Sequence, residues 1–153
     1  MMYEFFITIH AQPPGATAGA SIELNGRTVS TLHVDREALS TTTMDCTFEA
    51  ARTRLELLPR MFCEADGSFV CVSRQGAPAW QVDGNLYDRN ERLLFVDLKG
   101  TCPAEELDRF LTALGWPETR LMFQLTREAV FLDEAEFRRY AAIDPSPLPA
   151  GEG

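Results

Sequence analysis

The stretch QVDGNLYDRNERLLFVDLK, Gln81 to Lys99, predicts two β-strands joined by a tight turn. Apolar side chains recur at every second position in much of each half, which is the period of a strand with one buried face. The polar residues 89–91 between them include Asn90, and asparagine tolerates the left-handed backbone that such turns need. We therefore expect strands at 79–88 and 92–99 that pair antiparallel.

The apolar pattern also selects a register for this hairpin. If Asp88 faces Arg92 across a three-residue loop, Leu86 faces Leu94 and Val82 faces Leu98, so that one face is apolar throughout its middle. A two-residue loop would shift the register by one and set Val82 opposite Asp97, which mixes core and solvent positions. The preferred register places Asp83 directly opposite Asp97 on the second face.

Two carboxylates paired across strands at roughly 5 Å repel each other unless something neutralises them. Lys99 is one candidate, since strand side chains repeat every two residues and Lys99 therefore shares a face with Asp97. It is the only lysine of the chain, against thirteen arginines. A divalent cation such as magnesium is the other candidate, because hard ions prefer carboxylate oxygens.

The residues before this hairpin predict a helix and two more strands. Apolar side chains in 45–58 recur at helical spacing, and Pro59 ends the pattern. The segments 60–64 and 68–73 have strand composition and flank the turn residues Asp66-Gly67. Together with the hairpin they predict a meander of antiparallel strands.

A second helix is expected directly after the hairpin. Thr101 or Cys102 can cap it, and Pro103 suits its first turn. One apolar stripe runs along it, and glycine and proline at 115 and 117 end it. The segment 120–126 then predicts a further strand.

The two ends of the chain add three elements. Residues 3–9 alternate like a half-buried strand, and 20–34 carry Asn25-Gly26 between two β-rich runs, which is a strong hairpin signal. Asp133 and Glu136 form a capping pair for a last helix. For residues 1–44 as a whole, an extra sheet layer, a dimerisation element and a partner-binding edge all remain open.

These elements predict the α+β class: a mostly antiparallel, twisted sheet of about six to eight strands, with two or three helices packed on it. With 153 residues, of which 45% are hydrophobic, the chain can bury one sizeable core. We expect a single domain at 1–143. The tail 144–153, which holds three prolines and two glycines, is expected to be disordered.

The four cysteines form no CxxC pair. Cys63 and Cys71 flank the turn at Asp66-Gly67, and a two-residue turn there would place their thiols on opposite faces of the pair. We expect no disulfide between them, and we interpret all four cysteines as small buried hydrophobes.

The amino-acid composition restricts the classes of binding partner that we expect. The formal net charge of −9 opposes general binding to phosphate backbones or anionic lipid. No apolar run reaches the ~18 residues that span a bilayer, and the N-terminus lacks the pattern of a signal peptide. We therefore expect a cytoplasmic protein without a membrane partner.

The arrangement VDG at 82–84 and DLK at 97–99 resembles the PD-(D/E)xK nuclease-like superfamily. The helix, meander, helix and strand order of that family's core can be followed over residues 45–126. The resemblance implies a divalent-metal-dependent phosphodiester hydrolase, active or inactive, that acts on nucleic acid.

The resemblance also implies roles for particular residues. Asp83 and Asp97 would bind magnesium or manganese, and Lys99 would be catalytic, orienting the attacking water or stabilising charge on the phosphate. A helix glutamate often adds a ligand in that family, and Glu49 and Glu56 are both candidates.

The alternative is a non-catalytic, acidic protein-protein interaction module of the immunity protein, antitoxin or adaptor type. Its negative charge would steer it to a basic protein partner. In this interpretation Asp83, Asp97 and Lys99 form a surface charge cluster, and arginine can replace Lys99 at little cost.

Overall fold

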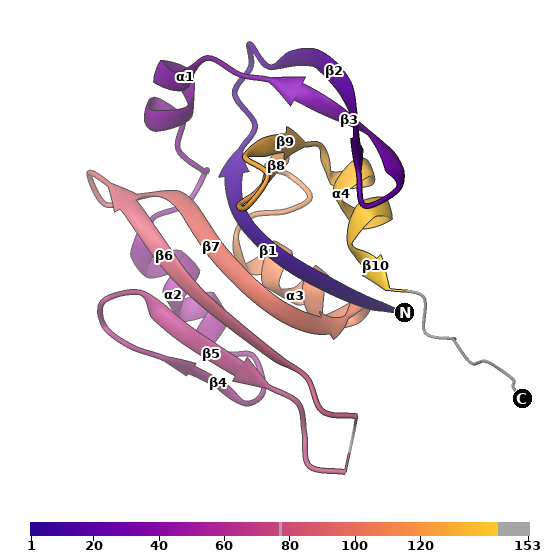
Figure 1. Cartoon of the computed structure of the whole chain (residues 1–153). Coiled ribbons are helices and arrows are strands. Elements are labelled where there is room, and N and C mark those ends of the chain that lie inside the picture. Colours follow the sequence, from indigo (N-terminus) through magenta and orange to yellow (C-terminus); the bar gives the residue numbers. More distant parts are fainter. Residues whose placement is uncertain (77, 144–153) are drawn as a thin grey trace, which may run out of the picture.

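The computed structural model of the chain describes residues 1–76 and 78–143. Within these residues, ten strands form one antiparallel sheet in the order β2-β3-β9-β8-β1-β7-β6-β5-β4, with β10 paired to β1 (Figure 1). The strands are β1 (Met2–Ala11), β2 (Thr17–Leu24), β3 (Arg27–His33), β4 (Met61–Cys63), β5 (Ser68–Val72), β6 (Gln81–Arg89), β7 (Arg92–Pro103), β8 (Leu121–Leu125), β9 (Val130–Leu132) and β10 (Ala142–Ile143). The helices are α1 (Arg36–Thr41), α2 (Phe48–Glu56), α3 (Ala104–Ala113) and α4 (Glu134–Ala141).

The α+β class is confirmed, whereas the number of elements differs from the expectation. The sheet of the described chain has ten strands rather than six to eight, because β9 and β10 have three and two residues, too few to show a period. The described residues also contain four helices, and α1 was not expected from the sequence. The expected tail at 144–153 lies outside the described residues.

The N-terminal strand β1 lies in the middle of the sheet and joins its two halves. On one side it pairs with β7 from Met2 to His10, and on the other with β8 from Ile7 to Ala11. Ile7 and Ile9 are fully buried. The meander β4-β5-β6-β7 therefore continues through β1 into β8, β9 and the β2-β3 hairpin.

The turn between β6 and β7 is shorter than the sequence pattern predicted. Asn90 and Glu91 have φ of 52° and 71°, and Arg89 pairs with Arg92. Two left-handed residues in a two-residue loop match the twist of a hairpin. The predicted three-residue loop is therefore wrong, although the left-handed conformation expected at this turn is present.

A β-bulge beside the turn preserves the apolar face. The register shifts by one residue between Tyr87 and Asp88. This shift adds to the one that the shorter loop causes, and two shifts of one residue return residues 82–87 and 95–100 to their expected faces. Leu86, for example, faces Val96. Between the bulge and the turn, Leu93 pairs with Asp88 and is buried.

The cross-strand partners of the charged residues change as a result. Asp83 faces Lys99, and Asp97 faces Asn85. The predicted direct pairing of Asp83 with Asp97 is therefore wrong. Asp83 and Asp97 nevertheless share one face with Lys99, as predicted.

The sheet has two unlike faces. On the first, which we call the helix face, Val82, Leu86, Val96 and Leu98 are at most 2% exposed. Helices α2 and α3 lie behind the sheet in Figure 1, where α2 contacts β6 and β7 and α3 contacts β7. The second, which we call the open face, carries the side chains of Glu4, Phe6, Thr8, His10, Phe62, Val70, Asp83, Asn85, Tyr87, Phe95, Asp97, Lys99 and Gln124.

Helix α4 packs against the helix face at β1 and β8. Its Phe137 is fully buried and stacks on Phe123 with ring centroids 4.4 Å apart. Tyr3 and Phe5 of β1 lie against the same ring. The Asp133 side chain caps this helix by accepting a hydrogen bond from the Glu136 backbone N–H, as the capping pair predicted.

All four cysteines are free, as expected, but Cys63 and Cys71 do not lie on opposite faces as predicted. Cys63 pairs with Phe69 and Met61 pairs with Cys71, so the β4-β5 register differs by one residue from a two-residue turn. Both thiols therefore lie on the helix face.

In the part of the chain that the structure describes, no helix has the length and apolar character required to cross a membrane.

Candidate functional site

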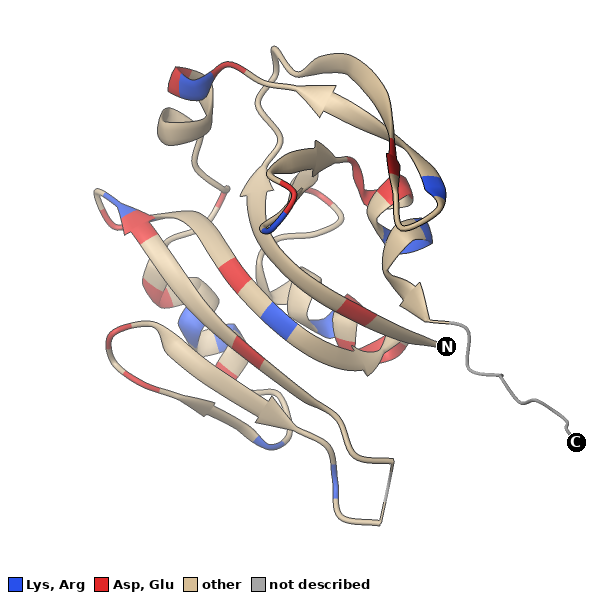
Figure 2. Ribbon diagram, in the orientation of Figure 1, with Lys and Arg blue, Asp and Glu red and all other residues tan. Residues whose placement is uncertain are grey.

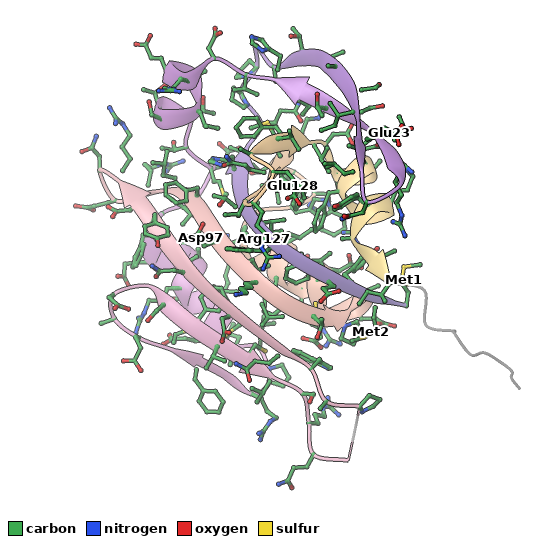
Figure 3. All side chains as sticks on the ribbon, in the orientation of Figure 1. Met1, Met2, Glu23, Asp97, Arg127 and Glu128 are labelled. Carbon is green, nitrogen blue, oxygen red and sulfur yellow. The ribbon has the colours of Figure 1, made fainter. Side chains whose placement is uncertain are left out.

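The sequence-predicted residues Asp83, Asp97 and Lys99 lie together on the open face, on the central strands β6 and β7. Asp83 and Lys99 are exposed, and Asp97 is half-buried. Figure 2 shows acidic and basic positions along β6 and β7, and Figure 3 shows Asp97 over the middle of the sheet. The structure thus brings these three side chains into one region.

The two helix glutamates lie elsewhere. Glu49 and Glu56 are exposed on α2, and Glu56 forms an ion pair with Arg52 at 3.4 Å. Because α2 packs on the helix face, the sheet separates both glutamates from Asp97. Among the described residues, no group of three or more His, Cys, Asp or Glu side chains could hold a metal ion. The four carboxylates predicted as magnesium or manganese ligands do not lie together, so neither glutamate can be a third ligand beside Asp83 and Asp97. The metal site stays a prediction.

Asp97 is held by a neighbour on β1. The Thr8 hydroxyl donates a hydrogen bond of 2.8 Å to Asp97 Oδ1, and Thr8 is the cross-strand partner of Asp97. Thr8 is 9% exposed. A hydrogen bond to an ionised acceptor is stronger than one between neutral groups. This contact fixes the carboxylate on the open face.

His10 lies next to this pair and is 6% exposed. Its Nε2 is 3.1 Å from Gln124 Oε1, so Nε2 donates and the neutral ring keeps a lone pair on Nδ1. The rings of Phe95 and Phe131 pack against it. Burial lowers the pKa of His10, while Gln124 and the charge of Asp97 act in the opposite direction.

Two buried polar atoms of the open face lack partners. His10 Nδ1 and Asn85 Oδ1 accept no hydrogen bond from any described residue. Asn85 faces Asp97 across β6 and β7. A buried acceptor without a donor costs about 1–3 kcal/mol, so these two atoms mark the least satisfied part of the face.

Large apolar side chains are exposed on the same face. Phe6 is 37% exposed, Tyr87 is 36% exposed and Phe62 is 55% exposed. Tyr87 stacks on Phe95 with ring centroids 4.5 Å apart. The open face therefore combines aromatic rings with the charges of Asp83, Asp97 and Lys99.

Lys99 contacts an aromatic ring as well as facing an acid. Its Nζ is 5.0 Å from the centroid of the Phe6 ring, and the guanidinium carbon of Arg127 is 5.5 Å from the same centroid. Cations at these distances are attracted by the ring quadrupole. Phe6 is thus positioned beside two positive charges in an acidic chain.

Sequence reasoning missed Phe6, Tyr87 and Phe62 as surface residues. For Phe6 a signal existed, because it alternates with Glu4 and Thr8 and so belongs to the polar side of β1. An aromatic residue at a polar position of a half-buried strand indicates an exposed ring. The cross-strand contacts of Thr8 could not be read, because β1 is distant in sequence from β7.

The buried cysteines provide no reactive group near neutral pH. Burial raises the pKa of Cys71 to about 11 and that of Cys102 to about 12. Only the thiolate is a strong nucleophile. Both residues are therefore best described as part of the core, as the sequence indicated.

Neither a family model, nor a curated protein, nor a solved structure matches this chain.

Proposed function

We propose that this chain is a non-catalytic protein-interaction module that binds its partner through the open face of the sheet. The observation that carries the proposal is the exposure of Phe6, Tyr87 and Phe62 on one face, opposite the face that the helices cover. Exposed aromatic rings among polar groups are typical of contact surfaces.

The charge of the chain points to a basic partner. The formal net charge is −9, and the acidic side chains of the open face include Glu4, Asp83 and Asp97, against Lys99 and the neighbouring Arg127. Complementary charge raises association rates and disfavours partners of like charge. A basic protein whose contact surface offers apolar side chains fits both features.

Affinity capture from the source cells tests the proposal. We compare the wild-type chain, the double variant Phe62→Ala/Tyr87→Ala, and Leu57→Ala. Leu57 is 80% exposed and directly follows α2, so its variant removes an exposed apolar side chain away from the open face. The thermal midpoint of each variant is measured first to establish that it is folded.

We expect a basic protein that the wild type and Leu57→Ala retain and the double variant loses. With the purified partner, loss of two exposed aromatic residues should weaken binding by roughly thirty-fold or more. Binding should also weaken with added salt. Equal retention of the partner by all three proteins would refute the assignment of the open face.

A metal-dependent phosphodiester hydrolase is the second candidate. The observation that favours it is the common face of Asp83, Asp97 and Lys99. The position of Glu49 and Glu56 on α2 does not support it. Binding of magnesium or manganese distinguishes the two candidates, as argued below.

A further inference from the structure

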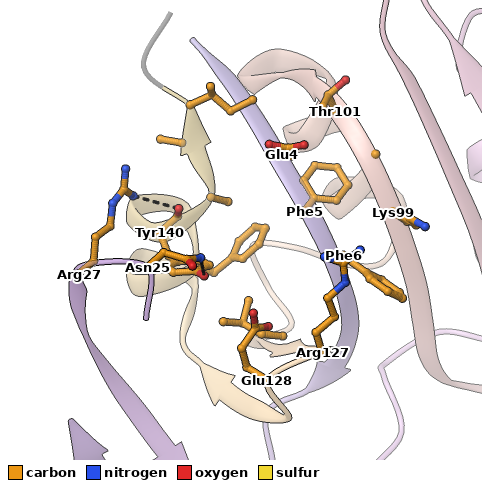
Figure 4. A pocket seen from close by; sticks show the side chains of 16 residues that line it. Glu4, Phe5, Phe6, Asn25, Arg27, Lys99, Thr101, Arg127, Glu128 and Tyr140 are labelled. Atoms are coloured by element: carbon orange, nitrogen blue, oxygen red, sulfur yellow. Dashed lines mark hydrogen bonds between the residues drawn. The ribbon is translucent and has the colours of Figure 1, made fainter. Parts of the chain in front are cut away.

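A gap in the sheet lies beside β1. On the side away from β7, β1 pairs with β10 at Met2 and Tyr3 and with β8 from Ile7 onward. The residues between these two pairings border a cavity of about 580 Å³ (Figure 4). Small-molecule sites commonly have volumes of this size.

The cavity has an aromatic wall. Its accessible part is the Phe6 ring, which is 37% exposed, while Phe5 and Phe137 line the cavity from the core and are 6% and 0% exposed. Tyr140 stands on the far side from β1, where the Asn25 amide donates a hydrogen bond of 2.7 Å to its hydroxyl oxygen. Within the described chain no acceptor takes the hydroxyl hydrogen of Tyr140, which is thus available to a ligand.

The ratio of basic to acidic residues is higher in the lining of the cavity than in the whole chain. Three basic side chains line it against two acidic ones, whereas the whole chain has 14 basic and 23 acidic residues. The basic residues are Arg27, Lys99 and Arg127, and the acidic ones are Glu4 and Glu128. None of the five takes part in the ion pairs found among the described residues.

The two ends of the cavity contribute different groups. Lys99 and Arg127 stand beside the Phe6 ring at one end (Figure 4). At the other end, Arg27 donates hydrogen bonds to the carbonyl oxygens of Arg139 and Tyr140, at 3.1 Å and 3.0 Å, which fixes its guanidinium. An anion near Phe6 would receive charge-assisted hydrogen bonds while an apolar body lies against the aromatic wall.

From this arrangement we infer that the cavity binds a small organic anion, a carboxylate or a phosphate ester that carries an aromatic body. This site borders the protein contact proposed above and shares Phe6 and Lys99 with the open face, whereas Phe62 and Tyr87 do not line it. Lys99 and Arg127 hold the anionic group, and the exposed ring of Phe6 contacts the aromatic body. The glutamates at the cavity accept hydrogen bonds from amino or hydroxyl groups of the ligand.

Anilinonaphthalene sulfonate, an aromatic anion whose fluorescence rises on binding, is the first probe. We expect saturable binding at one site, and the double variant Lys99→Gln/Arg127→Gln should weaken it by about tenfold or more, since two charge-assisted contacts are lost. The matched control is Arg74→Gln/Arg89→Gln. It changes the net charge equally at two exposed arginines that do not line the cavity.

Several outcomes would overturn the inference. Equal weakening by both double variants would mean that the dye responds to net charge alone. Loss of binding in Phe62→Ala would place the dye at strand β4 and away from the cavity, because Phe62 does not line the cavity. Absence of saturable binding would overturn it directly.

Competition then identifies the anionic group. Displacement of the dye by benzoate indicates a carboxylate ligand, and displacement by adenosine monophosphate indicates a phosphate ester. Inorganic phosphate should compete at least about tenfold less well than the better of the two, because it lacks a body for the aromatic wall. Failure of both aromatic anions, or equal competition by inorganic phosphate, contradicts the proposed ligand class.

Discussion

Asp83 of β6 lies directly opposite Lys99 of β7 on the open face of the sheet. An acid and a base paired across two strands attract each other weakly, whereas two opposed acids would repel. The sequence pattern alone had placed Asp97 opposite Asp83. The structure instead places Lys99, the only lysine of the chain, at that position. The charge of Lys99 therefore partly offsets that of Asp83, although the two side chains form none of the ion pairs found among the described residues.

The first prediction concerns metal binding. We expect magnesium and manganese to leave the thermal midpoint of the wild-type chain unchanged, because Asp83 faces Lys99 and the Thr8 hydroxyl donates to Asp97. The measurement is a thermal melt with and without each metal, for the wild type and for Asp97→Asn. Asp97→Asn should itself lower the free energy of unfolding by about 1 kcal/mol, since the bond from Thr8 loses its charged acceptor.

The opposite result would revive the nuclease interpretation. A metal that binds only the folded state, at a hundredfold excess over its dissociation constant, adds about 2.7 kcal/mol to the free energy of unfolding. A gain of this size in the wild type that disappears in Asp97→Asn would establish a carboxylate metal site on the open face.

The second prediction concerns Lys99 itself. Lys99→Arg should change the free energy of unfolding by less than about 1 kcal/mol, because arginine keeps the positive charge opposite Asp83 and can also lie over the Phe6 ring. Lys99→Glu should destabilise the fold more, since it places a third acid beside Asp83 and Asp97. Urea unfolding of the three proteins measures both values. A loss above that limit for Lys99→Arg would indicate a role that needs the compact ammonium group.

Local patterns predicted much of the fold, and contacts between distant segments account for most of what they missed. The Asn25-Gly26 hairpin and the Asp133 cap follow from residues a few positions apart, and both are present. The bulge in the β6-β7 hairpin could not be predicted, because a shorter loop with a bulge leaves the same residues on the same face as a longer loop without one. Hydrophobic periodicity predicts the face of the sheet on which a side chain lies. It does not predict which residue of the neighbouring strand lies opposite.

The candidate site shows the same limit. The sequence placed Asp97 and Lys99 on one face, because they are two residues apart in one strand. Thr8, which holds Asp97, lies 89 residues away in sequence, and no local pattern connects the two. The central place of β1 in the sheet arises from pairing between distant segments, which only the folded chain reveals.

The third prediction uses the backbone of β7. Gly100 has a φ of 144°, and a Cβ atom there would lie 2.1 Å from the Gln81 carbonyl oxygen. Gly100→Ala should therefore force β6 and β7 apart and lower the free energy of unfolding by at least about 2 kcal/mol. Gly15→Ala is the matched control, because no atom lies within 4 Å of its Cβ position and its φ is ordinary. Equal stability of the two variants in urea would show that β6 and β7 are not packed as closely as described.

The fourth prediction concerns His10 and pH. Burial lowers the pKa of His10 in the folded chain below its ordinary value of 6.5. As the pH falls through 6.5, the unfolded chain therefore binds a proton at His10 before the folded chain does. The unfolded state gains relative stability, and the free energy of unfolding falls by at most about 1.4 kcal/mol per pH unit until the folded pKa is reached.

The variant His10→Gln removes this titration and should show a smaller loss between about pH 7.5 and pH 5.5, where histidine is the side chain that ordinarily titrates. His33→Gln is the matched control, since His33 is the other histidine of the chain and is exposed. Urea unfolding at both pH values gives the change for each protein. We expect the wild type and His33→Gln to lose the same free energy on acidification and His10→Gln to lose less. An equal loss in all three would mean that acidification acts elsewhere and that the ring of His10 accepts its proton in the folded chain as readily as in the unfolded one.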